Sequence, residues 1–490
     1  MSKKTLIYLL LFIPVLSFAQ TEVASLKEFA SDVKQLTTTL RLSDKVYVTE
    51  VNTDNQHFDL TAIDDKMNIL WKTTLDGYSL TLGNFKGKII AVASTDFGSI
   101  KSKNNTYKGY LIDPATGKVT LSKIIYDNQQ EYQESPYFFH AEDGSIFKLA
   151  VRQTNLKRKL HVGFAGFSSV DADASETKDI VVMDFDEQLQ AVNTFHPAIS
   201  DDVFITMACN YSGTLFIAWY RKDGNVNVLS YPQGKTQPAA QINQSIEIHN
   251  GDSKKTAAKY FEFYPSVENQ NVLYYSILYK NLDNDPELTV SKLDFTKNTK
   301  NAVTEVFNKK HIKEIEKAYE PINKKLDKPE SISGKLLVVR SIKEENDRLL
   351  VFMSSRVVTA SATFSYGVWT TEGSMLINGY DLNLNAKYHQ IFPSHYTNTG
   401  LFLSTGYHKE KNTLHVISNF ETSASLYGSM DLTTGQWQSM SLIPKKKLSS
   451  YDYIQSSDVL WYPNGFIIPY LKLRGLMRTS RDIALQQIAY

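Results

Sequence analysis

The sequence predicts an all-β fold built from repeated short strands, and three observations support this prediction. Tyr and Phe occur 28 and 25 times in 490 residues, and both are typical of strands. Short apolar runs alternate with turns of Gly, Asn and Asp from about residue 45 onward. The turns fall into two families that recur along the chain, and these families define the repeat.

The first turn family follows an apolar run and usually begins with Asp. Its cleanest copy is Asp113-Pro114-Ala115-Thr116-Gly117-Lys118, and the next best is Asp431-Leu432-Thr433-Thr434-Gly435. In such a turn the Asp side chain accepts backbone hydrogen bonds, and Gly adopts a positive φ. Seven copies begin at Asp64, Asp113, Asp184, Tyr231, Asp294, Asp381 and Asp431.

The second turn family precedes an apolar strand. Its seven copies lie at Gly87, Gly144, Gly213, Asn271, Asp347, Asn412 and Gly465. The two families interleave from Gly87 onward. This leaves Asp64 unpaired near the start of the chain and Gly465 unpaired near its end.

The interleaved turns predict a single β-propeller, in which four-stranded blades surround an axis. Seven turns of each kind favour seven blades, with six or eight as alternatives. Strands from both termini are expected to close the ring. On this interpretation Asp64 and Gly465 belong to one blade. The tail from Arg474 to Tyr490 then competes with Val46–Val51 for one position in that blade.

Residues 1–19 read as a secretory signal peptide. Lys3 and Lys4 precede an apolar run from Leu6 to Leu16, and Ser17-Phe18-Ala19 supplies small residues for cleavage after Ala19. No Cys follows this run, so a lipoprotein anchor is not expected.

Residues 20–44 are predicted to form a helical lead-in. Leu26, Phe29, Val33 and Leu36 are spaced three or four residues apart, as on one face of a helix.

The predicted propeller domain covers residues 45–490 and carries insertions near 155–178 and 309–328. The second insertion is expected to contain a charged helix, because Ile312, Ile315 and Tyr319 recur at helical spacing and Pro321 limits them. Either insertion is placed to reach over one face of the propeller, where binding surfaces usually form.

Composition excludes several classes of function. The formal net charge is +1, which argues against a nucleic-acid partner. The Lys445–Lys447 and Lys309–Lys310 clusters are interpreted as solvated turns. No later apolar stretch has the length of a transmembrane helix. Cys209 is the only cysteine, so no internal disulfide forms, and its apolar neighbours predict a core position. A bacterial periplasm or exterior is the expected location.

The Asp113 turn resembles the repeats of quinoprotein-type (PQQ-like) propellers, in which Asp, Thr and Gly recur before a Trp; WD40-like repeats are a related comparison. Leu121 stands where the docking Trp of that family would be. The Asp431 copy has Gln436 for Lys and Ser439 for Trp, with Trp437 displaced by two. The resemblance implies the architecture and no specific functional family. Quinone-binding members often use a vicinal cysteine pair, which a single Cys cannot supply.

Catalytic motifs are missing from the sequence, including H-E-x-x-H, G-x-S-x-G, the P-loop and the dinucleotide fingerprint. Weaker signals are interpreted structurally. Ser94–Gly98 resembles a sialidase Asp-box but reads as a β-turn. Asp171–Ser175 starts like a calcium loop but reads as a solvated loop. His408 and His415 are expected as a surface pair across a hairpin, and Asp283 and Asp285 as a turn. The aromatic cluster of Tyr132 and Tyr137–His140 is expected to reflect strand alternation.

These observations favour an exported, monomeric, non-catalytic binding or scaffolding protein. A protein or glycan ligand is expected on one propeller face, near the axis or under the Lys309–Lys328 insertion. No catalytic, cofactor-binding or metal-binding residue is assigned, and no cofactor is expected. The alternative is a secreted glycan-active hydrolase or lyase with its active site on the axis, which inward carboxylates would favour. A further alternative is a role in envelope assembly.

Overall fold

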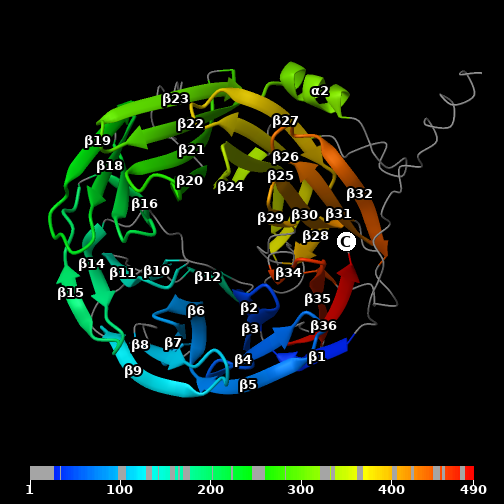
Figure 1. The fold of residues 1–490 in the computed structure, drawn as a ribbon. Helices are drawn as coiled ribbons and strands as arrows, with labels where there is room; N and C mark the ends of the chain where they lie inside the picture. Colours follow the sequence, from blue (N-terminus) through cyan, green and yellow to red (C-terminus); the bar gives the residue numbers. More distant parts are fainter. Residues whose placement is uncertain are drawn as a thin grey trace, which may run out of the picture.

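The structure, a computed structural model, describes most of residues 27–489. Residue 34 and the ranges 98–105, 129–134, 142, 155–160, 164–165, 169–176, 201, 222–223, 246–259, 282, 320–331, 333–336, 361–367, 395, 400–404, 421–423, 445–452, 455–457 and 475–479 lie outside the described part. The described strands form a ring of antiparallel sheets around one axis (Figure 1). This is a single β-propeller, as the turn families predict.

Seven blades are continuous in the chain and run from an inner to an outer strand. Blade 1 contains β2 (Gln35–Ser43), β3 (Val46–Asn52), β4 (His57–Asp64) and β5 (Ile69–Asp76); blade 2 contains β6 (Tyr78–Phe85), β7 (Lys88–Ser94), β8 (Thr106–Ile112) and β9 (Val119–Asp127); blade 3 contains β10 (Tyr137–His140), β11 (Phe147–Thr154), β14 (Thr177–Phe185) and β15 (Ala191–Phe195). Blade 4 contains β16 (Val203–Cys209), β17 (Leu215–Tyr220), β18 (Asn225–Tyr231) and β19 (Ala240–Ser245); blade 5 contains β20 (Tyr260–Pro265), β21 (Val272–Lys280), β22 (Pro286–Asp294) and β23 (Thr299–Val306). Blade 6 contains β24 (Leu337–Glu345), β25 (Arg348–Ala360), β26 (Val368–Asp381) and β27 (Ala386–Phe392), with β28 (Tyr396–Thr399) also paired to β26; blade 7 contains β29 (Thr405–Glu410), β30 (Thr413–Phe420), β31 (Ala424–Asp431) and β32 (Trp437–Pro444).

The eighth blade joins the two ends of the chain. Its inner strands are β33 (Tyr453–Ile454) and β34 (Leu460–Tyr462), followed by β35 (Gly465–Arg474) and β36 (Ser480–Ala489). Its outer strand is β1 (Lys27–Val33), which pairs antiparallel with β36. The predicted closure by terminal strands is therefore confirmed, and the ring presents no open edge between its first and last blades.

The helical lead-in predicted for residues 20–44 is wrong where the structure describes it. Residues 27–33 and 35–43 form β1 and β2, which belong to two different blades. The helix-like spacing has a different origin. The pairing of β1 with β36 is irregular between Glu28 and Ala30 and again between Ala30 and Val33, and Asp32 has a φ of 55°. These irregularities break the alternation that would have identified a strand.

The most favoured blade count of seven is also wrong, and the alternative count of eight is correct. Each first-family turn connects the third and fourth strands of a blade, and each second-family turn connects the first and second. The partner of Asp64 is the β2–β3 turn at Asp44 and Lys45, which the helical interpretation hid. Gly465 has no partner because the third and fourth strands of blade 8, β36 and β1, do not follow one another in the chain.

Asp64 and Gly465 therefore lie in neighbouring blades and not in one blade. Asp64 ends β4 of blade 1, whereas Gly465 begins β35 of blade 8. The two blades are nevertheless in direct contact. The Tyr462 hydroxyl donates to the Asp64 carbonyl oxygen at 3.2 Å, and the Tyr47 hydroxyl donates to the Trp461 carbonyl oxygen at 2.6 Å. The tail after Arg474 does not compete with Val46–Val51, since it forms β36.

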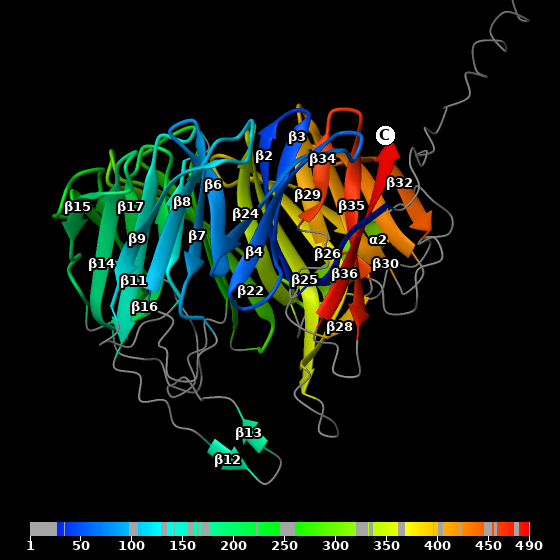
Figure 2. The same ribbon diagram turned by 90° about the horizontal axis from the view of Figure 1, so that it is seen from below.

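The two faces of the ring differ in their connections. Both turn families lie on one face, which we call the turn face. The connections between second and third strands, and those between blades, lie on the opposite face, which we call the long-connection face. It receives the connection between β11 and β14, of which the structure describes residues 161–163 and 166–168, and the connection between β23 and β24, of which it describes residues 307–319 and 332. The β12 (His161–Gly163) and β13 (Gly166–Ser168) hairpin extends from this face away from the ring (Figure 2).

The predicted charged helix is present as α2 (Lys309–Ala318). Asn308 caps its first turn, with the Asn308 side chain accepting from Lys310 N and His311 N. Ile312 and Ile315 are buried against blades 5 and 6. The helix lies at the outer edge of the ring beside β27, and it does not reach over the axis (Figure 1). The described residues therefore form no ligand site beneath this helix near the axis.

The Asp-type turns hold adjacent blades together. Asp113 Oδ1 accepts from Ala115 N and Thr116 N, each at 3.0 Å, as the sequence indicates. The docking aromatic comes from the preceding blade, because Trp71 Nε1 on β5 donates to the Pro114 carbonyl oxygen at 2.9 Å. Tyr388 on β27 serves the Asp431 turn in the same way, donating to the Leu432 carbonyl oxygen at 3.0 Å. Most of the core lies between blades, where the facing sides of neighbouring sheets pack.

Candidate functional site

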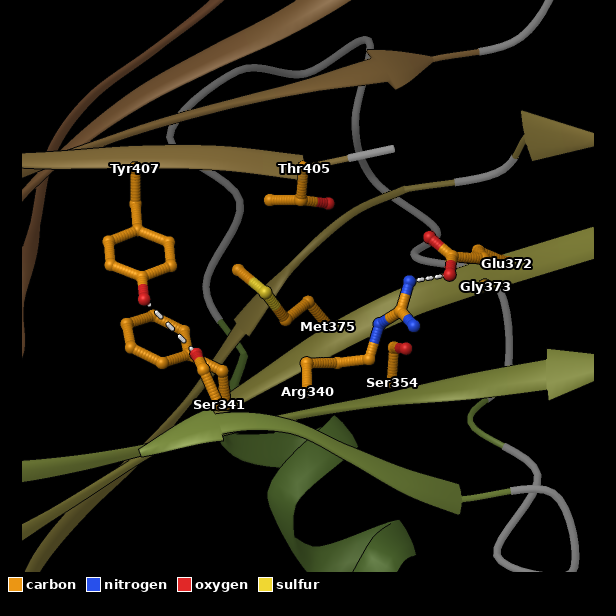
Figure 3. Close-up of a pocket in the computed structure, with 9 residues that line it drawn as sticks. Arg340, Ser341, Ser354, Glu372, Gly373, Met375, Thr405 and Tyr407 are labelled. Atoms are coloured by element: carbon orange, nitrogen blue, oxygen red, sulfur yellow. Dashed lines mark hydrogen bonds and ion pairs between the residues drawn. The ribbon is translucent and has the colours of Figure 1, made fainter. Parts of the chain in front are cut away.

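A pocket opens between blades 6 and 7 near the axis (Figure 3). Its empty volume is about 490 Å³, including open solvent at its mouth. The lining comes from β24, β25 and β26 of blade 6 and from β29 of blade 7: Arg340, Ser341, Phe352, Ser354, Glu372, Gly373, Met375, Thr405 and Tyr407. β24, β26 and β29 all begin at the long-connection face, and Arg340, Glu372 and Thr405 lie in their first halves. The pocket thus belongs to the face that carries the longest connections.

The pocket combines an apolar floor with a short polar wall. Phe352 and Tyr407 stack with their ring centroids 4.5 Å apart, and the Met375 side chain is buried beside them. Arg340 and Glu372 form an ion pair in the wall. The buried Ser354 hydroxyl has no hydrogen-bond partner among the described residues. A mostly apolar pocket with a few polar groups is the usual form of a binding site.

A second group of side chains lies on the inner strands of blades 5, 6 and 7. Burial raises the pKa of Glu262 on β20 to about 7, although Arg340 and Lys343 oppose this change. Burial also lowers the pKa of Lys343, whose ammonium group lies 5.0 Å from the centre of the Tyr264 ring. Glu345 pairs with Lys409 of blade 7 at 3.2 Å. Glu262 interacts with Arg340 of the pocket, whereas Glu345 and Lys409 lie near the turn-face ends of β24 and β29.

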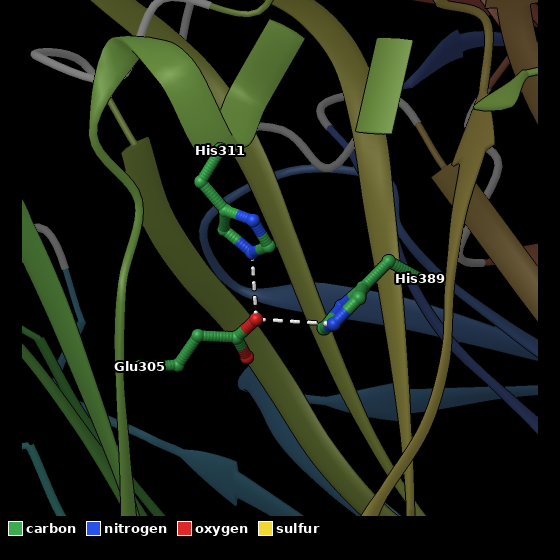
Figure 4. A group of neighbouring side chains, drawn as sticks. All are labelled: Glu305, His311 and His389. Atoms are coloured by element: carbon green, nitrogen blue, oxygen red, sulfur yellow. Dashed lines mark hydrogen bonds and ion pairs between the residues drawn. The ribbon is translucent and has the colours of Figure 1, made fainter. Parts of the chain in front are cut away.

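A third group lies at the outer edge of the ring, between blades 5 and 6 (Figure 4). Glu305 on β23 faces His311 on α2 and His389 on β27. Its Oε1 atom is 2.7 Å from His311 Nε2 and 3.0 Å from His389 Nε2. The possible ligand atoms of the three side chains lie within 4.8 Å of one another. These are the described residues that are best placed to hold a metal ion.

The histidine pair predicted at His408 and His415 is directly opposed across β29 and β30, as expected. The surface interpretation is wrong for His415, which is buried and whose Nδ1 atom lies 2.6 Å from the Tyr427 hydroxyl. Both rings pack against Trp461 of blade 8. Burial lowers the pKa of each histidine to about 4. The pair therefore packs between blades 7 and 8.

The other sequence signals have structural roles wherever the structure describes them. Cys209 is half-buried, and burial raises its pKa to about 12, so its thiol is not activated. Asp96 accepts from Ser94 Oγ at 3.0 Å within a turn. Asn281 Oδ1 accepts from Asp283 N and Asp285 N, which confirms the predicted turn. Residues 1–19, Tyr132, the Asp171–Ser175 segment and the Lys445–Lys447 cluster lie outside the described residues.

Sequence reasoning missed both side-chain groups around Arg340 and Glu305. Their members lie on different strands or blades, so no local spacing connects them. The only sequence signal for these residues is the position that each one occupies within its four-stranded repeat. His389 follows Asp381 on an outer strand, and Glu305 lies on the outer strand of the preceding blade. This relationship becomes readable once the blades have been correctly counted.

Comparison with known sequences finds no match, either to a family profile or to a curated protein. Solved structures with a similar fold include the WD40 domain of SCAP from fission yeast, with a TM-score of 0.41 and 10% identity over 96% of this chain and 97% of that one. The dihydro-heme d1 dehydrogenase NirN has a TM-score of 0.44 and 10% identity, covering 96% and 78%. Prolyl oligopeptidase B from Galerina marginata has a TM-score of 0.44 and 8% identity, covering 90% and 55%.

These likenesses concern the fold alone. The sheet topology defines the protein as an eight-bladed β-propeller, and no narrower family is identified. No helix in the described part of the chain is long and apolar enough to cross a membrane.

Proposed function

We propose that this protein is an exported, non-catalytic binding protein that docks a protein partner on its long-connection face. The observation that supports this proposal is the apolar pocket between blades 6 and 7. Phe352, Met375 and Tyr407 offer an apolar surface that can take up an aliphatic or aromatic side chain of a partner. Ser354 Oγ is available to hydrogen-bond a polar group at the end of that side chain.

The pocket lining also argues against hydrolysis within this pocket. Glu372 is the one carboxylate among the described lining residues, and Arg340 neutralises it. Glycoside hydrolysis ordinarily needs two carboxyl groups on opposite sides of the scissile bond. Binding accounts for the lining without a further assumption.

Site-specific photo-crosslinking tests the docking proposal. A photoreactive phenylalanine analogue at Thr405, on the pocket rim, is compared with the same analogue at Thr434, which is exposed on the turn face. We expect a discrete crosslinked protein from the Thr405 position that excess unlabelled wild type removes. Excess Ser354→Trp, in which the pocket is filled, should not remove it. Equal crosslinking from both positions, or equal competition by both proteins, would contradict the proposal.

A glycan-active hydrolase or lyase is the second candidate, and Glu262 is the observation that favours it. A carboxyl group with a pKa of about 7 is suited to act as a general acid near neutral pH. The assay measures release of reducing ends from a panel of glycans by the wild type and by Glu262→Gln. Turnover that Glu262→Gln abolishes would establish the enzyme, whereas equal turnover by both proteins would remove Glu262 from consideration.

Export and a monomeric state belong to the same proposal and rest on the sequence of residues 1–19 and on the closed ring. Expression of the full chain followed by intact-mass measurement of the secreted or periplasmic fraction tests both cleavage after Ala19 and location. A cytoplasmic chain that keeps its first 19 residues would contradict export. Light scattering measures the oligomeric state of the cleaved protein.

A further inference from the structure

The Glu305, His311 and His389 side chains come from three elements that meet at one point. β23 is the outer strand of blade 5, β27 is the outer strand of blade 6, and α2 lies beside β27. Both histidines direct Nε2 at the same carboxylate oxygen, Glu305 Oε1 (Figure 4). The exposed fractions of the three side chains range from 18% to 28%, so a hydrated ion can reach them.

Hydrogen bonding on the far side of His389 fixes the role of each ring nitrogen. His389 Nδ1 lies 2.8 Å from Asn378 Oδ1. The Asn378 amide is itself oriented, because its Nδ2 donates to the Val351 carbonyl oxygen at 3.2 Å. Nδ1 of His389 therefore carries a hydrogen. In the neutral ring the Nε2 lone pair then points at Glu305 Oε1, 3.0 Å away.

Two acceptors that face each other at this distance require a positive charge between them or on one of them. His311 Nε2 also approaches Glu305 Oε1, at 2.7 Å, and His311 Nδ1 lies 3.8 Å from Glu314 Oε2, so both histidines converge on one carboxylate oxygen. Histidine ligands of metal ions ordinarily donate their other ring hydrogen to an oxygen acceptor, which is the arrangement of His389 with Asn378. A tightly held proton or a metal ion would satisfy the group.

A hydrogen bond on the far side of Glu305 fixes the orientation of its carboxylate group. The second oxygen, Oε2, accepts from the Tyr380 hydroxyl at 3.0 Å. The carboxylate is thus oriented by its own hydrogen bond while Oε1 remains directed at the histidines.

We propose that Glu305, His311 and His389 form a binding site for a divalent first-row transition metal, with Zn²⁺ as the preferred ion. Two imidazoles and one carboxylate are nitrogen and oxygen ligands of the kind that Zn²⁺ takes, at about 2.0–2.2 Å. In a tetrahedral site the fourth position would be taken by water or by a side chain of a partner. Nitrogen ligands exclude Ca²⁺ and Mg²⁺, which prefer oxygen.

The bound ion would fasten α2 to the outer strands of blades 5 and 6. Asn308 and α2 belong to the connection over residues 307–336, which leads back to the inner strand of blade 6. The metal would therefore anchor this connection of the long-connection face. This inference does not depend on the pocket between blades 6 and 7, and either can hold without the other.

Metal titration of the purified, EDTA-treated protein tests the proposal. ZnCl₂ binding is followed by calorimetry, and CoCl₂ binding by the visible absorption of tetrahedral Co²⁺. The variants are His311→Ala, His389→Ala and Asn378→Ala. The matched control is His196→Ala, because His196 Nδ1 lies 2.8 Å from Asp179 Oδ2 in a pair of the same kind that has no third ligand among the described residues.

We expect one Zn²⁺ per chain in the wild type and in His196→Ala, with affinity lowered more than about tenfold in each ligand variant. Asn378→Ala should weaken binding by roughly 10- to 100-fold, because it frees the His389 ring. Circular dichroism checks that every variant is folded, and His389→Gln replaces His389→Ala if the latter is not. Absence of Zn²⁺ binding in the wild type would overturn the proposal, as would binding by His311→Ala and His389→Ala that is as tight as that of the wild type.

Discussion

The glycine of the Asp431 turn offers a sharp test of how neighbouring blades are joined. Gly435 has a φ of +72°, and a Cβ atom there would lie 2.3 Å from Tyr388 Cγ. Gly87 has the same φ of +72°, and a Cβ atom there would meet nothing within 4 Å. The two glycines thus share one backbone conformation and differ only in their neighbours. Gly435→Ala and Gly87→Ala form a matched pair.

The expected magnitudes follow from this difference. A left-handed conformation costs an L-residue roughly 1–2 kcal/mol, which is all that Gly87→Ala should lose. Gly435→Ala must also displace the Tyr388 ring. The ring also lies against Gly379, where a Cβ atom would be 2.4 Å from Tyr388 Cζ, so the ring has little room to move. Overpacking of this kind costs about 1–3 kcal/mol, so Gly435→Ala should be more destabilising by that amount.

Urea denaturation followed by tryptophan fluorescence gives the midpoint of unfolding for each variant. We expect a larger decrease for Gly435→Ala than for Gly87→Ala. In a Tyr388→Ala background the extra loss at Gly435 should disappear, because the two residues are coupled by direct contact. Equal destabilisation by both glycine variants would refute the argument that the aromatic ring fastens blade 6 to the turn of blade 7.

Three further predictions concern the ring and its buried charges. Removal of residues 1–33 takes away β1, the partner of β36, whereas removal of residues 1–26 keeps it. The longer deletion should therefore lower the melting temperature and promote self-association, measured by light scattering, because the edge of β36 is exposed. A monomer of unchanged stability would contradict this prediction. Lys148 and Asp184 form a buried ion pair at 2.6 Å. In urea denaturation, Lys148→Met should lower the free energy of unfolding by about 3–5 kcal/mol, because it leaves the Asp184 charge buried without a partner. The double variant Lys148→Met with Asp184→Leu should recover most of this lost stability. The pKa of His415 is about 4 in the folded protein, below the unfolded value of 6.5. Protonation of the unfolded chain should therefore lower the free energy of unfolding by about 2 kcal/mol between pH 7 and pH 5. His415→Gln should lessen this loss, and a pH profile of stability identical to that of the wild type would argue against the reasoning.

The Asp-type turns show which features are readable from sequence. In Asp113–Lys118 the acceptor, the donors and the positive-φ glycine lie within six consecutive residues, so local composition specifies the turn. The same holds for the cap of α2 by Asn308 and for the Asn281 turn. Counting such turns predicted the propeller. It gave seven blades because β1 and β2 lack regular alternation and concealed the turn at Asp44 and Lys45.

The side-chain groups with chemical interest could not be predicted in this way. Arg340 meets Glu372 across one sheet, and Tyr407 reaches the same pocket from the next blade. Glu305 and His389 lie on the outer strands of two different blades. No residue spacing within a single strand encodes such a meeting. It depends on register and on the packing of one blade against another.

The sequence by itself determined the all-β class, the four-stranded repeat and the turn chemistry, because strand alternation and turn hydrogen bonds involve residues close together in the chain. Only the tertiary structure decided the blade count, the closure of blade 8 by β1, and the placement of the pocket and of the Glu305, His311 and His389 group. Each of these depends on contacts between residues distant in the chain, such as Lys27 with Leu485. Such contacts form when the ring closes, and the local pattern of the sequence does not record them.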